Sequence, residues 1–340
     1  MRTKAKYIIL LSLLCTLSLQ GQCQPQAVNF ANTHAVATPD PVFESLKYKF
    51  QVKKATLANG HTVAYVDEGK GAETIILIHG LGSYLPAWEK NIAAFKSSYR
   101  TIALDLPGYG KSSKENVQAS MDGYAKVVLE LMDQLKVKQA ILAGHSMGGQ
   151  IAITAALQAP QRVNRLILVA PAGLETFTEQ QKQLFKITVT PESIQNTTSE
   201  QTQANYKANF YNMPADAQHM IDDRLMMAQS GQFGAYCKVV AGSVAAMVDE
   251  PVYERLPQLS MPTLIVFGEQ DALIPNKYFN PGLTTEAVAK AGIERIPNSQ
   301  MVMIPEAGHF LQFEQPAAFN RAVLDFLSKK EYLNSNQYKH

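Results

Sequence analysis

The stretch Gly144-His145-Ser146-Met147-Gly148 constrains the fold more than any other part of this chain. Residues 139–143 before it have the character of a buried strand, and residues 149–159 after it have that of a helix. A serine at such a junction is forced into a tight, strained turn that exposes its oxygen at the edge of a sheet. The adjoining helix N-terminus favours negative charge there. The pattern predicts that Ser146 is a nucleophile; the alternative is a serine in an ordinary glycine turn.

Strand-like and helix-like segments alternate on both sides of this turn. The expected strands are residues 52–57, 62–66, 74–78, 101–104, 139–143, 165–170, 263–267 and 300–304. The expected helices are residues 88–95, 121–135, 149–159, 285–295 and 317–326. Uniformly apolar strands that alternate with helices predict an α/β fold, with a mostly parallel sheet and helices on both faces. The side chains that follow these strands, among them His79, Asp105 and Ser146, should gather at one edge of the sheet.

The alternation stops between residues 174 and 256. This stretch contains no convincing buried strand and has helical segments near residues 179–186, 199–210 and 215–229. An insertion of about eighty residues is too long for an ordinary loop. We expect a helical lid over the site, inserted into a core formed by residues 49–173 and 257–330.

The N-terminal residues are typical of a targeting segment. Arg2, Lys4 and Lys6 precede an apolar run over residues 8–19, which is too short to span a bilayer. We therefore expect a signal peptide over residues 1–23, followed by an irregular tether over residues 24–48. Retention as a membrane anchor and lipidation of Cys23 are the alternatives. The chain is expected to be exported, either periplasmic or secreted, and to meet a membrane only through this segment or such a lipid anchor.

Composition excludes several classes of function. A net charge of +2 gives no basic surface for nucleic acid. An apolar share of 46% and a charged share of 18% are typical of a globular protein with a large core. Of three cysteines only Cys237 lies well inside the folded body, so no internal disulfide is expected. No cluster of cysteine and histidine has metal-binding spacing, and neither a metal nor a cofactor is expected.

Two later segments provide the groups that a serine nucleophile needs. A serine hydroxyl requires a base within hydrogen-bond reach and a third group to orient that base. Asp271 follows the strand over residues 263–267, and His309 follows the strand over residues 300–304. Glu269 is the rival acid, but it stands at the start of its turn and Asp271 at the end. His145 is expected to lie buried beneath the site, and His79 to hold the loop after its strand.

An oxyanion that forms during acyl transfer is best stabilised by fixed backbone N–H groups. The residue after the nucleophile, Met147, is the first predicted donor. The second is Leu81, in the glycine-rich loop His79-Gly80-Leu81-Gly82 that follows the strand over residues 74–78. An ordinary strand-to-helix turn would suit the same glycines.

Together these segments resemble the α/β-hydrolase superfamily. The resemblance rests on the loop at Leu81, on Asp105-Leu106-Pro107-Gly108-Tyr109-Gly110, on the Ser146 turn, on Gly268-Glu269-Gln270-Asp271 and on Gly308-His309. The chain order Ser146, Asp271, His309 is the order of that superfamily. The resemblance covers residues 50–330, apart from the lid. It implies the α/β-hydrolase fold and a lidded serine hydrolase similar to carboxylesterases, lactonases, perhydrolases and carbon–carbon bond hydrolases.

The leading hypothesis is hydrolysis of a carboxylic ester of a small or medium apolar acyl compound through an acyl-enzyme on Ser146. Carbon–carbon bond hydrolysis of a ring-fission product is the second hypothesis, and the haloperoxidase-like perhydrolases and lactonases share the triad. Residues 308–314 are similar to the tail motif of the carbon–carbon hydrolases, in which Phe310 takes the place of a tryptophan. The same resemblance implies a lid arginine that holds a substrate carboxylate, for which Arg224 is the candidate; the alternative is a solvated surface arginine. A binding module without catalysis is the third hypothesis. Substrate identity and oligomeric state stay open.

Overall fold

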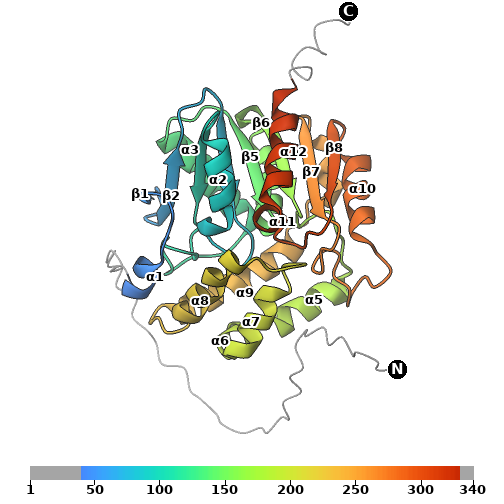
Figure 1. The fold of residues 1–340 in the computed structure, drawn as a ribbon. Coiled ribbons are helices and arrows are strands. Elements are labelled where there is room, and N and C mark those ends of the chain that lie inside the picture. The colour runs from blue at the N-terminus through green and yellow to red at the C-terminus, as the bar shows by residue number, and fades with distance from the viewer. Residues whose placement is uncertain (1–39, 330–340) are drawn as a thin grey trace, which may run out of the picture. The chain divides into compact units, whose positions relative to one another are not determined.

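Residues 40–329 are described by a computed structural model and form an eight-stranded sheet with helices on both faces (Figure 1). The strands lie side by side in the order β1-β2-β4-β3-β5-β6-β7-β8. β2 runs antiparallel to both β1 and β4, and every other neighbouring pair is parallel. The bounds are β1 Lys53–Thr56, β2 Thr62–Glu68, β3 Thr74–Ile78, β4 Arg100–Leu104, β5 Ala140–His145, β6 Val163–Val169, β7 Thr263–Gly268 and β8 Ser299–Ile304. The predicted α/β class is confirmed.

The central strands are buried on both faces. Every residue of β3, β5 and β7 is buried, because helices cover the two sides of the sheet. The covering helices are α2 Glu89–Phe95, α3 Met121–Gln134, α4 Met147–Gln158, α10 Thr285–Arg295, α11 Leu311–Glu314 and α12 Pro316–Ser328. α2 and α12 lie in front of the sheet in Figure 1 and pack against each other. Phe95 of α2 contacts Phe319 of α12, with ring centroids 6.5 Å apart. α3 packs against α4.

Five helices stand between β6 and β7, where the sequence predicts a helical insertion. They are α5 Glu179–Thr188, α6 Pro191–Gln195, α7 Ser199–Lys207, α8 Gln218–Met227 and α9 Phe233–Asp249. Residues 174–256, all of them described, contain no strand, and in Figure 1 these helices lie together below the carboxyl ends of the strands. The described residues also contain four short 3-10 helices: η1 Leu85–Trp88, η2 Pro160–Arg162, η3 Ala215–Ala217 and η4 Tyr253–Gln258. We call residues 174–256 the helical insertion.

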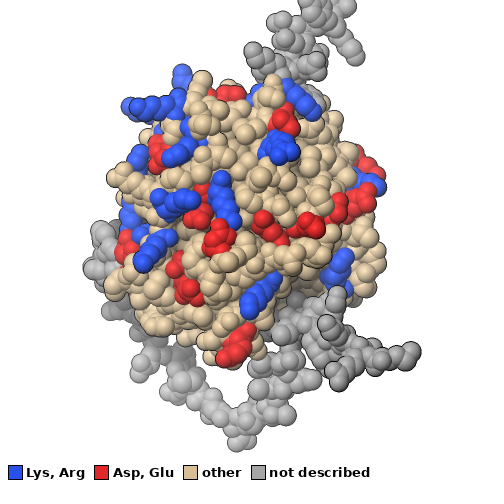
Figure 2. Space-filling view, in the orientation of Figure 1, with Lys and Arg blue, Asp and Glu red and all other residues tan. Residues whose placement is uncertain are grey.

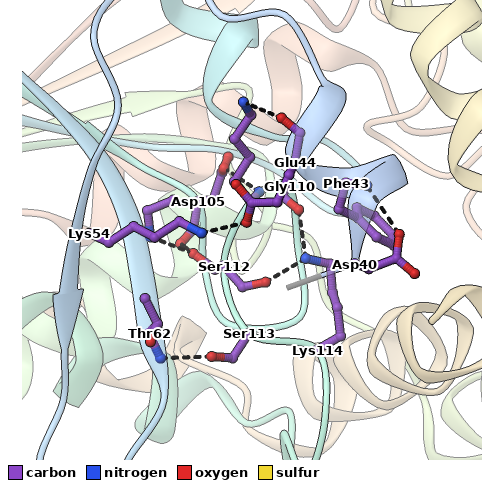
Figure 3. Close-up of polar contacts among 12 residues, drawn as sticks. Asp40, Phe43, Glu44, Lys54, Thr62, Asp105, Gly110, Ser112, Ser113 and Lys114 are labelled. Atoms are coloured by element: carbon purple, nitrogen blue, oxygen red, sulfur yellow. Dashed lines mark hydrogen bonds and ion pairs between the residues drawn. The ribbon is translucent and has the colours of Figure 1, made fainter. Parts of the chain in front are cut away.

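Helix α1, Pro41–Ser45, attaches the start of the described chain to both the core and the helical insertion. Its capping residue Asp40 accepts a hydrogen bond from the hydroxyl of Ser230, in the insertion, at 2.8 Å. Phe43 covers the buried ammonium of Lys114, which lies 4.1 Å from the ring centroid and donates to the carbonyl of Gly110 at 2.6 Å (Figure 3). Burial lowers the pKa of Lys114 to about 8.

The folded part begins earlier than the sequence predicts. Within the predicted irregular tether over residues 24–48, residues 41–45 instead form helix α1, and Phe43 and Leu46 are each only 2% exposed. The proline at position 41, which suggests irregular chain, occupies the first turn of a helix, where its missing N–H costs no hydrogen bond. The predicted signal peptide, Cys23 and the rest of the tether lie outside the described residues and stay predictions.

Charges of both signs mingle on the face of the molecule that Figure 2 shows, over the sheet as well as over the helical insertion. Surface ion pairs also join separate elements, such as the pair between Lys90 and Asp216 at 2.9 Å, which connects α2 to the insertion. Within residues 40–329, no helix has both the length and the apolar character that a membrane crossing requires.

Candidate active site

The turn at Ser146 has the strained geometry that its sequence predicts. Its backbone dihedrals are φ 55° and ψ −119°, a region that residues with a Cβ rarely adopt. A Cβ on Gly144 would lie 2.1 Å from the carbonyl oxygen of Gly148, so a larger residue there would displace the first turn of α4. Within the buried segment from residue 140 to residue 156, Ser146 alone is not fully buried. The fold therefore exposes this hydroxyl at the carboxyl end of β5, as expected.

Asp271 and His309 meet at the same edge of the sheet. His309 Nδ1 donates a hydrogen bond to Asp271 Oδ2 at 2.8 Å, and both residues are only 4% exposed. The other carboxylate oxygen of Asp271 accepts the backbone N–H groups of Leu273 and Ile274, at 2.8 and 3.0 Å. Such bonds fix the carboxylate in one orientation. Glu269, the rival acid, is exposed to solvent and is not paired with His309 within the described residues.

The side chain of His145 connects the serine turn to the loop that carries His309. Its ring is buried and lies 4.7 Å from the ring of His309, centroid to centroid. Its Nε2 lies 2.9 Å from the backbone carbonyl oxygen of His309. A carbonyl only accepts, so Nε2 carries the proton, and burial holds the pKa of His145 well below its usual range. The prediction that His145 lies beneath the site is confirmed. Ser146 Oγ itself makes no hydrogen bond within residues 40–329. The hydrogen bond between a nucleophile and its base is often long before substrate binds.

The loop after β3 lies against the serine turn. A Cβ built on Gly80 would come within 3.1 Å of the Cβ of Ser146. Within the described chain, the N–H groups of Leu81 and Met147 donate to no other protein group, so both are free for an oxyanion. His79 holds the loop as predicted: its Nδ1–H donates to the carbonyl of Gly80 at 2.8 Å, and its Nε2 accepts the N–H of Leu106 at 3.0 Å.

Asp105 supports the continuation of this loop, a role that its sequence position does not reveal. The side chain is fully buried, and one oxygen accepts the N–H of Leu85 at 2.7 Å. The second oxygen accepts the hydroxyl of Tyr48 at 2.6 Å and the N–H of Lys111 at 2.8 Å. Burial raises the pKa of the Asp105 carboxyl. In the sequence, the one sign of this role is the position of an acidic residue directly after a strand that is predicted to be buried.

The two candidate substrate-binding residues have different surroundings. Phe310 is 5% exposed, and its ring packs between those of His145 and Phe210, at centroid distances of 4.7 and 5.4 Å. This is a packing position that joins the helical insertion to the serine turn. Arg224 is half-buried on α8, and its guanidinium lies 4.8 Å from the ring centroids of Phe233 and Tyr236. It forms no ion pair with an acidic side chain of residues 40–329.

This sheet, with a strained serine at one strand end and a buried aspartate–histidine pair beside it, is the architecture of the α/β hydrolases. The sequence profile of the alpha/beta hydrolase fold matches residues 73–316, and the chain belongs to that family. The superfamily resemblance seen in the sequence is thereby confirmed.

Two curated relatives extend this result. The chain is 32% identical over 267 residues to the dihydrolipoyllysine-residue acetyltransferase component of the acetoin cleaving system of Pseudomonas putida. That match covers 77% of this chain and 65% of the relative, so this chain corresponds to only part of that protein. It is 29% identical over 274 residues to a 2-hydroxy-6-oxononadienedioate/2-hydroxy-6-oxononatrienedioate hydrolase of Cupriavidus pinatubonensis, with 77% of this chain and 89% of that protein covered.

Solved structures agree with the fold. A probable hydrolytic enzyme from Pseudomonas aeruginosa PAO1 superimposes with a TM-score of 0.76 at 27% identity, over 84% of this chain and 96% of that one. A thermophilic esterase from Thermogutta terrifontis gives a TM-score of 0.65 at 26% identity, over 82% and 98% of the two chains. The chain is therefore similar both to esterases and to carbon–carbon bond hydrolases, and it is a hydrolase by family.

Proposed function

We propose that this hydrolase cleaves a carboxylic ester of a small or medium apolar acyl compound through an acyl-enzyme on Ser146. The observation that carries the proposal is the buried hydrogen bond of 2.8 Å between His309 and Asp271, beside the strained and accessible Ser146. Similarity to the Thermogutta esterase supports the reaction class.

In the proposed reaction each residue has one role. His309 takes the proton of Ser146 as its oxygen attacks the ester carbonyl, and later returns that proton to the leaving alcohol. Asp271 holds the imidazole in the required tautomer and stabilises its charged form. The N–H groups of Leu81 and Met147 stabilise the oxyanion. Water then attacks the acyl-enzyme, with His309 as base, and releases the acid.

The proposal is tested with a series of p-nitrophenyl esters of increasing acyl length, assayed with the wild type, Ser146→Ala and, as a matched control, the exposed Ser97→Ala. We expect turnover of the shorter esters, loss of at least about a thousandfold in kcat for Ser146→Ala, and no change for Ser97→Ala. Full activity in Ser146→Ala would refute the mechanism.

Arg224 favours a second candidate, hydrolysis of a carbon–carbon bond in an acidic ring-fission product. A half-buried guanidinium without an acidic partner in the described chain is suited to a substrate carboxylate. The similar Cupriavidus protein is named for a dienedioate substrate. If this candidate is right, the absorbance of a 2-hydroxy-6-oxo-dienedioate falls on addition of enzyme, and Arg224→Gln lowers kcat/KM more than the exposed Arg255→Gln. Turnover of neutral esters alone would exclude it.

A further inference from the structure

The loop that carries Leu81 is held from two different parts of the molecule. The core holds its first half, since the carbonyl of Gly80 accepts both His79 Nδ1–H at 2.8 Å and the N–H of Ser83 at 3.2 Å. These contacts close a four-residue turn, Gly80 to Ser83, with Leu81 at its second position. Gly82 has a φ of +65°, which glycine adopts without the strain that a Cβ would cause. The backbone of a glycine also rotates more freely than that of other residues.

The second half of the turn is held by the helical insertion. The carbonyl oxygen of Gly82 accepts the hydroxyl of Tyr236, from α9, at 3.2 Å and the hydroxyl of Tyr206, from α7, at 3.4 Å. A carbonyl oxygen has two lone pairs and accepts both donors. Within residues 40–329 these two hydroxyls are the only groups that hydrogen-bond to this carbonyl.

The ring of Tyr236 is firmly packed. It is 2% exposed, stacks on Phe233 with centroids 5.8 Å apart, and meets Tyr109 edge-on at 5.9 Å. The guanidinium of Arg224 lies over its face. The hydroxyl position is therefore set by several elements at once, and a phenylalanine at this position would keep the packing while it removed only the donor.

We propose that Tyr206 and Tyr236 are positioning residues for the oxyanion site. Their hydroxyls fix the peptide between Gly82 and Ser83, whose N–H donates to the carbonyl of Gly80. That carbonyl belongs to the same peptide as the N–H of Leu81, which the helical insertion thereby holds in its productive direction. The oxyanion site is then complete only while the insertion is in place. This inference rests on the proposed function, because it assigns Leu81 as an oxyanion donor.

The geometry predicts a particular relation between the variants. Each hydroxyl can hold the carbonyl when the other is absent, so Tyr206→Phe and Tyr236→Phe should each lower kcat by only about 2–3-fold, whereas the double variant should lose ~10-fold or more, since misplacing an oxyanion donor is costly. KM should change little. Tyr124→Phe is the matched control, because its buried hydroxyl donates to the carbonyl of Pro107 on a different loop, at 3.3 Å.

A pair of inhibitors separates positioning from general loosening. A trifluoromethyl ketone adds to Ser146 and forms an oxyanion, whereas the corresponding trifluoromethyl alcohol does not. The double variant should lose affinity for the ketone by the same factor as kcat and keep its affinity for the alcohol. Wild-type kcat in the double variant, or an equal loss of affinity for both inhibitors, would overturn the inference.

Two controls keep the result decisive. If the double variant does not fold, the single variants decide, and wild-type ketone affinity in both overturns the inference. Ester turnover that is absent from the wild type, or that survives Ser146→Ala, refutes the proposed function. Turnover that depends on Ser146 but ignores both tyrosines refutes only the inference.

Discussion

The backbone of Ser146 predicts a conflict between stability and activity. At φ 55° and ψ −119° a residue with a Cβ is strained by about 1–3 kcal/mol, whereas glycine is not. Ser146→Gly removes that strain, and the greater freedom of the unfolded chain offsets about 0.4–1 kcal/mol of the gain. Ser146→Ala loses the same hydroxyl but keeps the Cβ and the strain. We therefore expect the glycine variant to unfold with a free energy ~1 kcal/mol higher than that of the alanine variant.

Urea unfolding of the two variants, followed by circular dichroism, measures this difference directly. Both variants are expected to be inactive, so activity does not confound the comparison. With a slope of about 3 kcal/mol per molar urea, a difference of ~1 kcal/mol moves the midpoint by about 0.3 M. If the midpoint of Ser146→Gly is equal to or below that of Ser146→Ala at the same slope, the Ser146 turn is not strained.

Three further predictions concern the site and its supports. Asp271→Asn should lower kcat by about 10³–10⁴-fold because the imidazole loses its required tautomer, whereas the exposed Glu269→Gln should not; equal losses would contradict the assignment of the acid. Burial lowers the pKa of His79 from 6.5 to about 4, so at this residue the unfolded chain binds more protons than the folded one between these values. His79 alone should therefore lower the free energy of unfolding by about 3 kcal/mol as the pH drops from 6.5 to 4. In urea titrations at several pH values His79→Asn should lack this loss, and equal pH dependence in both proteins would argue against it. Phe43→Ala should lower the free energy of unfolding by about 3 kcal/mol, as for other buried phenylalanines, and the 66% exposed Tyr278→Ala should change it little; equal thermal midpoints for the wild type and Phe43→Ala would show that α1 adds nothing.

The sheet was predictable because its signal is local. A run such as Thr74–Ile78, in which four residues are β-branched and four are apolar, is typical of a buried strand, and its observed bounds equal the predicted ones. Helix α10 also has its predicted bounds, Thr285–Arg295. The pairing of Asp271 with His309 followed from chain order, because each residue follows a parallel strand and such strand ends meet at one edge.

The parts that sequence reasoning missed depend on distant contacts. Helix α9, Phe233–Asp249, contains Gly234 and Gly242, which weaken its intrinsic helix signal, and burial against other elements stabilises it instead. The hydroxyl of Tyr236 reaches Gly82 across 154 positions of sequence, a separation over which no local pattern exists. Helix α1 is too short to show a periodicity, and Phe43 is buried by contacts with the distant residues Lys114 and Tyr236.

The placement of α1 bears on how the protein is handled on surfaces. α1 lies beside α8, whereas α12 ends at the opposite edge of the sheet (Figure 1). Immobilisation on a solid support through a group placed after α12 therefore leaves the helical insertion facing the solution. Attachment just upstream of Asp40 instead brings the insertion toward the support. Because the insertion lies below the carboxyl ends of the strands, where Ser146 follows β5, the choice of end decides whether this side of the molecule faces the solution or the support.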